Sequence, residues 1–322
     1  MQMQNSTLME TSRRASARLL AVPGVRDPAG GPVVAAKAGR QHRVAMALGA
    51  VCLLLLATAP AKAAHTINPE ADRKAFQAYF FAKFPKVAKS DYGNGPYAIN
   101  AEMRAQWKQV MEFPPYVFAL DDGKARWAKP FPDGKHYADC FENKGVGIRQ
   151  TYPRFDVKTG KVVTLEDAIN ACRVEHGDKP LKLGGQKMAS LTAVMAHSSR
   201  GKPFDIVIPN DPRALAAYEH GKEVFYSRKG QLGISCASCH VLAAGERLRG
   251  DYLAPALGIL AAMPIYRAHW GNMGTITRRF TSCSKKTRAE PMKPDGAGYR
   301  DLDYFLSYMS NGIPITGPGA RP

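Results

Sequence analysis

The sequence predicts a mainly α-helical chain made of two similar halves. Several stretches carry apolar residues at helical spacing, and each half contains an interval bounded by cysteines, 140/172 in the first and 236/283 in the second. A weak internal repeat supports the division, because Met188–Val207 and Leu302–Ile315 both contain a helix followed by Gly-x-Pro. Chance similarity of two helix ends is the alternative explanation.

The elements follow from spacing and from helix-terminating residues. Pro85 ends the first helix, and Pro212 lies near the start of the helix that opens the second half. The Pro- and aromatic-rich stretch around Met111–Pro132 is expected to be a loop. The predicted helices are Asn68–Phe84, Leu165–Val174, the start of Met188–Val207, Asp211–Arg228 and Arg300–Ser310.

The N-terminus has the pattern of a secretion signal. Residues 1–43 are basic, Val44–Ala59 carries no charge, and Ala61-Lys62-Ala63 fits an Ala-x-Ala cleavage site. The apolar run is shorter than the roughly 20 residues that span a bilayer. We expect residues 1–63 to be removed on export to the periplasm, leaving no membrane span; an uncleaved anchor is the alternative.

Residues 236–240 read Cys-Ala-Ser-Cys-His, the pattern of covalent haem c attachment. Cys236 and Cys239 would carry the haem, and His240 would present a ring nitrogen to the iron. A zinc half-site would need a second Cys-x-x-Cys, which the sequence lacks. A structural disulfide is the plainer alternative. Cys140 is followed by Phe-Glu-Asn-Lys, so one haem c per chain is expected, in the second half.

The second axial ligand is open on chemistry alone. The candidates downstream of His240 are Met263, Met273, Met292, His269 and Cys283, and spacing favours Met292. With Cys52 in the signal and two cysteines bound to haem, three remain, of which two could form a disulfide in an oxidising compartment.

Three segments of the second half resemble the SoxA family of haem c subunits. They are Arg-Arg-Phe-Thr-Ser-Cys at 278–283, Thr-Arg-Ala-Glu-Pro at 287–291 and Asn-Gly-Ile-Pro-Ile at 311–315. The similarity extends through Tyr-Pro-Arg-Phe at 152–155, Cys172 and Gly-Asp at 250–251. It implies two cytochrome c-like domains in tandem, 64–207 and 208–322, only the second carrying haem, as in single-haem members.

The resemblance also implies roles for particular residues. Cys283 would be both the axial iron ligand opposite His240 and the catalytic cysteine, as a persulfide, and Arg279 would bind the substrate. Cys140 and Cys172 would pair as a disulfide. Arg247 is a second candidate for anion binding on weaker grounds. For Lys285 and Lys286, a solvated surface is as good an explanation as a role at the site.

The implied activity is L-cysteine S-thiosulfotransferase, which oxidatively conjugates thiosulfate to a cysteine of a carrier protein. That reaction releases two electrons, and one haem iron accepts one at a time, so a second haem on a partner subunit is expected. The family implies a SoxX-like cytochrome c as that subunit, a SoxYZ-like carrier, and a downstream cytochrome c as electron acceptor.

A second class of function is a soluble periplasmic electron-transfer cytochrome with no bond-making chemistry. A third is a haem-containing peroxidase, which would need an open distal site. A net charge of +18 is consistent with either of the first two functions and fits anions or acidic partners. No motif that interleaves basic and aromatic residues for nucleic acid is present in the sequence, so nucleic acid is not expected.

Overall fold

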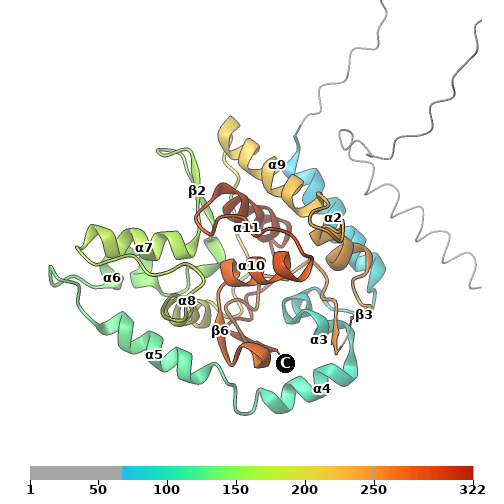
Figure 1. Cartoon of the computed structure of the whole chain (residues 1–322), viewed down its shortest axis with the longest axis horizontal. Coiled ribbons are helices and arrows are strands. Elements are labelled where there is room, and N and C mark those ends of the chain that lie inside the picture. The colour runs from blue at the N-terminus through green and yellow to red at the C-terminus, as the bar shows by residue number, and fades with distance from the viewer. Residues whose placement is uncertain (1–66, 249, 322) are drawn as a thin grey trace, which may run out of the picture. The chain divides into compact units, whose positions relative to one another are not determined.

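The computed structural model describes residues 67–248 and 250–321, so the predicted signal segment lies outside the described residues (Figure 1). Asn68–Pro322 forms one compact unit. Within it, the chain is mainly helical, as predicted. No helix of the described residues is both long and apolar enough to cross a bilayer.

Helices follow one another along the chain, connected by loops and short helical turns. In chain order, the α-helices are α2 (Pro69–Lys83), α3 (Pro96–Ile99), α4 (Ala101–Val110), α5 (Val117–Ala128), α6 (Tyr137–Cys140), α7 (Leu165–Glu175), α8 (Gln186–Ser198), α9 (Pro212–Tyr226), α10 (Ile276–Lys286) and α11 (Ala297–Met309). The short helical turns are η1 (Lys89–Asn94), η2 (Glu142–Gly145), η3 (Arg149–Thr151), η4 (Ser238–Leu242) and η5 (Ala268–Trp270).

The strands are short and form three small sheets. The pairs are β1 (Arg154–Asp156) with β2 (Lys161–Val163) and β3 (Arg247–Leu248) with β4 (Asp251–Tyr252), both antiparallel. In the third sheet, β5 (Ile265–Arg267) lies between antiparallel β6 (Asn272–Gly274) and parallel β7 (Gly319–Arg321).

A succession of elements in the first half recurs 111 residues later. Helix α7 begins at Leu165 and α10 at Ile276, and α8 and α11 begin at Gln186 and Ala297 with the same length. The strand pairs β1–β2 and β5–β6 show the same offset and register. The repeat predicted from two Gly-x-Pro segments is therefore one part of a longer recurrence of structure.

Each half also contains a close helix crossing at a glycine. Gly221 of α9 faces α11 so closely that a Cβ atom there would lie 2.0 Å from the carbonyl oxygen of Asp301. Gly123 of α5 faces α8, where a Cβ would lie 2.2 Å from the carbonyl oxygen of Ser190. Ser190 and Asp301 are again 111 residues apart, so α5–α8 and α9–α11 are equivalent pairs.

The prediction of a loop around Met111–Pro132 was therefore wrong, because Val117–Ala128 forms helix α5. Prolines at 114 and 115 precede the helix rather than interrupt it. The signal was available in the sequence as Gly123-Lys124, which matches Gly221-Lys222 of α9. The helix at Asn68–Phe84 is confirmed, with the Asn68 side chain accepting from the Ala71 amide at its start.

Segments that follow the two repeated helices pair with each other. Pro203 and Pro314 form an antiparallel bridge, in which the amides of Phe204 and Gly312 donate to the carbonyls of Ile313 and Phe204. The two halves are thereby joined through the two Gly-x-Pro segments that revealed the repeat.

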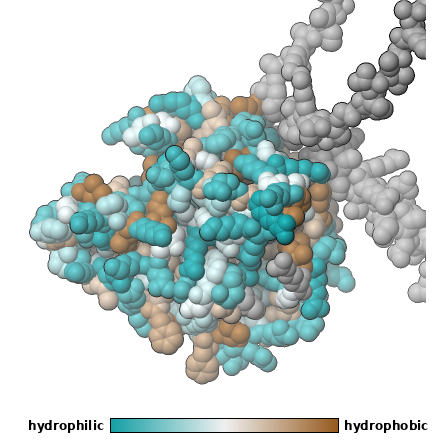
Figure 2. All heavy atoms as spheres, viewed as in Figure 1, coloured by the Kyte–Doolittle hydropathy of each residue, from teal (hydrophilic) through white to brown (hydrophobic). Residues whose placement is uncertain are grey.

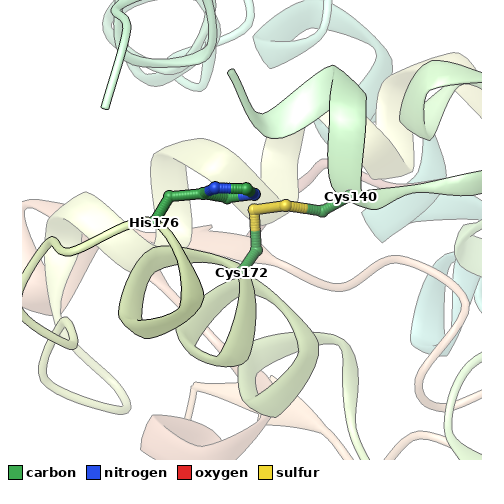
Figure 3. A group of neighbouring side chains, drawn as sticks. All are labelled: Cys140, Cys172 and His176. Carbon is green, nitrogen blue, oxygen red and sulfur yellow. A yellow bond between two sulfur atoms is a disulfide. The ribbon is translucent and has the colours of Figure 1, made fainter. Parts of the chain in front are cut away.

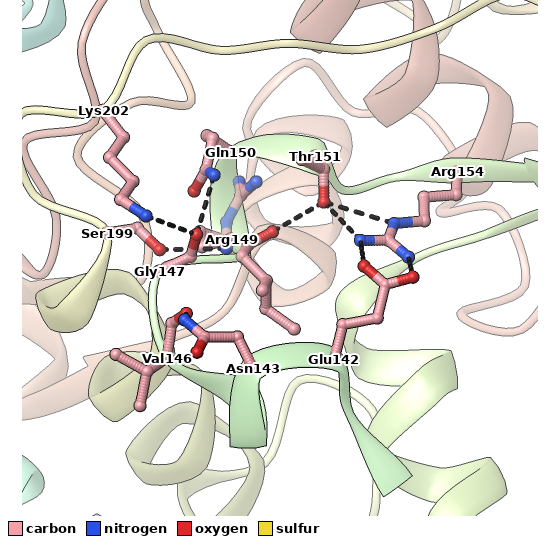
Figure 4. A network of polar contacts seen from close by, with 11 residues as sticks. Glu142, Asn143, Val146, Gly147, Arg149, Gln150, Thr151, Arg154, Ser199 and Lys202 are labelled. Atoms are coloured by element: carbon pink, nitrogen blue, oxygen red, sulfur yellow. Dashed lines mark hydrogen bonds and ion pairs between the residues drawn. The ribbon is translucent and has the colours of Figure 1, made fainter.

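The loop between η2 and β1 is held to the end of α8 by a polar network (Figure 4). The Ser199 hydroxyl accepts from the Arg149 amide at 2.9 Å, and Lys202 donates to the Gly147 carbonyl at 3.0 Å. Arg154 forms an ion pair with Glu142 at 3.1 Å. These bonds fix the backbone that carries the buried side chain of Arg149.

The surface face in Figure 2 is largely hydrophilic, with apolar side chains gathered near the connection between α4 and α5. That connection carries exposed Phe113 and Phe118, with 89% and 83% of their surface accessible, flanked by Val110 and Val117. The core lies elsewhere, where Phe76 of α2 contacts Phe225 and Phe305 edge-on.

Candidate active site

Helix α10 carries two of the predicted site residues. The Thr275 side chain accepts from the Arg278 amide and begins the helix. Arg279 and Cys283 are four residues apart and therefore lie on the same face of α10. Glu166 fixes the start of this helix, because its buried carboxylate accepts from the amide and the hydroxyl of Thr277 at 3.2 and 2.9 Å.

His240 is oriented by the backbone. It lies in the π-helical turn η4, and its Nδ1 lies 2.9 Å from the Ala254 carbonyl oxygen. A carbonyl oxygen only accepts, so Nδ1 carries the proton and Nε2 keeps a free lone pair. That tautomer is the one a metal-binding histidine needs.

The structure brings together the five residues predicted to form the haem site and substrate contact. Cys283 lies close enough to His240 for the imidazole to lower the pKa of its thiol, and close enough to Cys236 and Cys239 to influence both of their thiols. Burial, followed by Cys283, raises the pKa of Cys236 to about 12 and raises that of Cys239. All three cysteines are free and partly buried.

Cys283 differs from these two cysteines in its electrostatics. Burial alone would raise the pKa of its thiol, but Arg279, His240 and Lys286 outweigh burial and lower it to about 6. A thiol in this environment is ionised at neutral pH, which is the state required of a nucleophile or metal ligand.

Arg279 is poorly satisfied by the protein itself. Its Nη1 atom is buried and has no hydrogen-bond partner within residues 67–248 and 250–321. The neighbouring Arg278 is used structurally, since it donates to the Met273 carbonyl at 3.1 Å and lies 4.4 Å from the Trp270 ring centre. A buried guanidinium with an unused donor is suited to binding an anion.

The other ligand candidates lie in different surroundings. Met292, favoured by spacing, packs against Gly298 and lies 4.0 Å from the Lys229 amine. Met263 and Met273 are buried, Met273 in a cluster with Tyr116, and His269 is exposed. Arg247, the weaker anion-binding candidate, is exposed in β3.

Three residues near Arg279 were not singled out from the sequence. Arg267 and Arg321 both act electrostatically with Arg279, and the ring of Tyr97 lies beside Arg321. They come from β5, β7 and α3, and no local motif connects them. Only the fold could have identified them.

In the first half, a disulfide joins Cys140 and Cys172, as the resemblance implied (Figure 3). Cys172 follows the start of α7 by seven residues, as Cys283 follows the start of α10. His176 lies beside the disulfide, but its Nδ1 is held 2.7 Å from Asp133. With both sulfurs oxidised, this group offers no thiolate to a metal.

The sequence model of the SoxA/TsdA cytochrome c domain matches residues 122–204 and 220–315. A relative from Allochromatium vinosum, L-cysteine S-thiosulfotransferase subunit SoxA, is 46% identical over 273 residues, covering 84% of this chain and 97% of the relative. This chain belongs to the SoxA family. A Chlorobaculum tepidum SoxA is 44% identical over 276 residues, covering 85% of this chain and 96% of the relative.

A solved structure agrees with the family assignment. The crystal structure of SoxXA from P. pantotrophus matches with a TM-score of 0.60 and 32% identity, covering 65% of this chain and 79% of that one. A mainly helical, cytochrome c-like fold and the SoxA family together imply haem c. The donor set fits this group, since two free thiols, a histidine with a free Nε2 and an ionisable thiol meet at one place.

Proposed function

We propose that this chain is the catalytic subunit of a periplasmic L-cysteine S-thiosulfotransferase, which conjugates thiosulfate to a cysteine of a carrier protein. The observation that carries the proposal is that His240 and Arg279, the latter one helical turn from Cys283, both act on the Cys283 thiol and lower its pKa. The names and high coverage of the SoxA relatives favour this function over plain electron transfer.

The residues that would hold one covalent haem c are Cys236 and Cys239 for attachment and His240 and Cys283 for the iron. When bound, the haem supplies one-electron acceptance and, with a thiolate ligand, a low potential. The domain division is part of the proposal: a haem-free domain at 64–207 with the disulfide Cys140–Cys172, and a haem domain at 208–322. The 111-residue recurrence of elements supports two tandem cytochrome c-like domains.

The chain's own residues would bind and orient the sulfur anion. Arg279 would hold the sulfonate oxygens through charge-assisted hydrogen bonds, using the donor that no protein group within the described residues occupies. The outer sulfur would then face Cys283, whose ionised thiol, or the persulfide derived from it, is the reactive sulfur. Fixing this geometry is the main contribution of α10, which Glu166 holds at its first turn.

The overall reaction conserves atoms and charge. A carrier thiol and thiosulfate, which bears two negative charges, give a carrier thiosulfonate that bears one negative charge, a proton and two electrons. One S–S bond forms and one S–H bond breaks. Because a single haem accepts one electron at a time, a second haem on a SoxX-like partner subunit and a downstream cytochrome c would receive the pair.

Other partners and the location follow from the same function. The carrier would be a SoxYZ-like protein with an accessible cysteine. Export to the periplasm is supported by the charge-free run and the Ala-x-Ala site before residue 64.

Cys283→Met in the mature, haem-loaded heterodimer tests the proposal. A methionine can ligate iron but supplies no nucleophilic sulfur, so we expect carrier conjugation, measured by intact mass of the carrier, to fall by at least about 10³-fold while haem stays attached. The matched control is Met292→Leu, which removes the ligand favoured by spacing and should leave turnover within about 2-fold. Retained turnover in Cys283→Met would refute the role of Cys283.

A further inference from the structure

Arg267 and Arg321 are opposite each other in the parallel pair β5–β7. Paired residues of neighbouring strands lie on the same face with their Cβ atoms about 5 Å apart. Like charges in this position repel, and each guanidinium is also repelled electrostatically by Arg279. The fold therefore places three positive charges together, and the arrangement is stabilised only if negative charge is brought to it.

The protein supplies one carboxylate to these three cations. Within the described residues, the ion pair to this group is Arg267–Asp251 at 3.3 Å, and neither Arg279 nor Arg321 forms one. Burial, together with Arg267 and Arg279, lowers the pKa of Arg321 to about 10. The cluster therefore carries an excess of positive charge.

Two donor atoms at the same place lack partners. The buried Arg279 Nη1 and the buried Tyr97 hydroxyl have no hydrogen-bond partner within the described residues. The Arg321 guanidinium lies 5.9 Å from the centre of the Tyr97 ring. Burial raises the pKa of Tyr97 to about 12, so its hydroxyl stays protonated and can donate at neutral pH.

The surrounding backbone makes room for Arg321. A Cβ atom at Gly95 would lie 2.1 Å from an Arg321 guanidinium nitrogen, so a side chain there would displace the guanidinium. On its other side, Arg321 borders a cleft of about 350 Å³ that Tyr97, Trp107 and Thr316 also line. The cluster therefore borders a cleft through Tyr97 and Arg321, and its Arg279 acts electrostatically on Cys283.

We propose that Arg267, Arg279, Arg321 and Tyr97 form an oxyanion site that selects doubly charged tetrahedral sulfur anions over singly charged sulfur donors. The inference rests on the proposed function and specifies its substrate class. The excess of positive charge favours thiosulfate, which carries two negative charges, whereas hydrosulfide carries one and has no oxygens to accept from the free donors. Guanidinium groups suit the sulfonate because they donate in pairs.

The test is Arg321→Gln in the haem-loaded heterodimer. Arg321 forms no ion pair within the described residues, so its replacement does not deprive a carboxylate of its partner. Equilibrium binding of thiosulfate and of sulfate, measured by calorimetry without the carrier, should weaken about 10- to 100-fold, as expected for losing charge-assisted hydrogen bonds. The KM for thiosulfate should rise by a similar factor, and the KM for sulfide by less than about 2-fold. Tyr97→Phe, which keeps the ring, should weaken thiosulfate binding about 3- to 10-fold.

The matched control is Lys285→Gln, which removes one positive charge from the exposed end of α10. It should change thiosulfate binding by less than about 2-fold; an equal loss would indicate long-range attraction and overturn the proposal. Arg321→Lys, which keeps the charge, should recover only part of the affinity. Haem absorbance per protein confirms that each variant is folded and loaded.

The carboxylates of the haem are also anions that could bind these arginines, and the same variant distinguishes them from thiosulfate. If they occupy the cluster, Arg321→Gln will shift the haem potential while thiosulfate binding stays unchanged, and the proposal is wrong. If the wild-type protein conjugates thiosulfate but Arg321→Gln binds thiosulfate as tightly as wild type, the oxyanion site is rejected and the proposed function stands. If the wild-type protein does not conjugate thiosulfate to the carrier, the proposed function is rejected instead.

Discussion

The crossing of α9 and α11 gives a sharp test of the repeated architecture. In Gly221→Ala, the new Cβ would lie 2.0 Å from the Asp301 carbonyl oxygen and 2.9 Å from Phe305 Cβ. Both helices must separate by about 1 Å, because the obstacle is backbone rather than a flexible side chain. The separation loosens the contact between Phe225 and Phe305, whose ring centres are 5.5 Å apart.

The expected cost follows from two opposing terms. Overpacking a well-packed interface costs about 1–3 kcal/mol or more, and alanine gains about 1 kcal/mol over glycine in a helix interior. With the overpacking at the upper end, the free energy of unfolding falls by about 2 kcal/mol. For a unit of this size that lowers Tm by about 4–8 °C.

Thermal unfolding of the haem-loaded protein, followed by circular dichroism at 222 nm, measures the effect. Gly250→Ala is the control, because nothing lies within 4 Å of a Cβ there and Tm should stay within about 1 °C. Gly123→Ala in the first half should lower Tm about as much as Gly221→Ala, because its clash with Ser190 is equivalent. An unchanged or raised Tm in Gly221→Ala would refute the close crossing.

Three further outcomes are expected. Burial raises the pKa of Asp303 to about 6 from a usual 3.8. The contribution of this group to the free energy of unfolding is therefore complete below pH 4 and falls by about 3 kcal/mol as pH rises through 6. Asp303→Asn should make the denaturant midpoint less dependent on pH over that window, and an unaltered dependence would contradict the assignment. Replacing Cys140 and Cys172 together by serine should cost about 4 kcal/mol, because the bond closes a loop with a sequence separation of 32, and should make Tm insensitive to reductant. Glu166→Ala leaves the Thr277 donors at the start of α10 unpaired, so stability should fall by about 3 kcal/mol in urea unfolding; a fall below about 1 kcal/mol would mean that water replaces the carboxylate.

Much of the local structure was readable from the sequence. Apolar spacing located α2, α7 and α9, and prolines marked one end of α2 and of α9, since these signals act within a few residues. The repeat was visible in two Gly-x-Pro segments, which are themselves 111 residues apart, but its extent was not, because most paired positions hold different residues. Helix α5 was missed because prolines and aromatics nearby obscured the Gly-Lys pair that matches α9.

The sequence by itself indicated the Cys-x-x-Cys-His segment as a candidate haem site, Cys283 as the candidate reactive cysteine, and the arginine four residues before it. These depend on spacing within one turn of a helix or loop, which the chain fixes locally. Only the tertiary structure decided that Cys283 meets His240, and that Arg321 pairs with Arg267 beside Arg279. The reason is physical: charge balance and burial belong to groups gathered from distant segments, and no short stretch of sequence records which of them the fold will bring together.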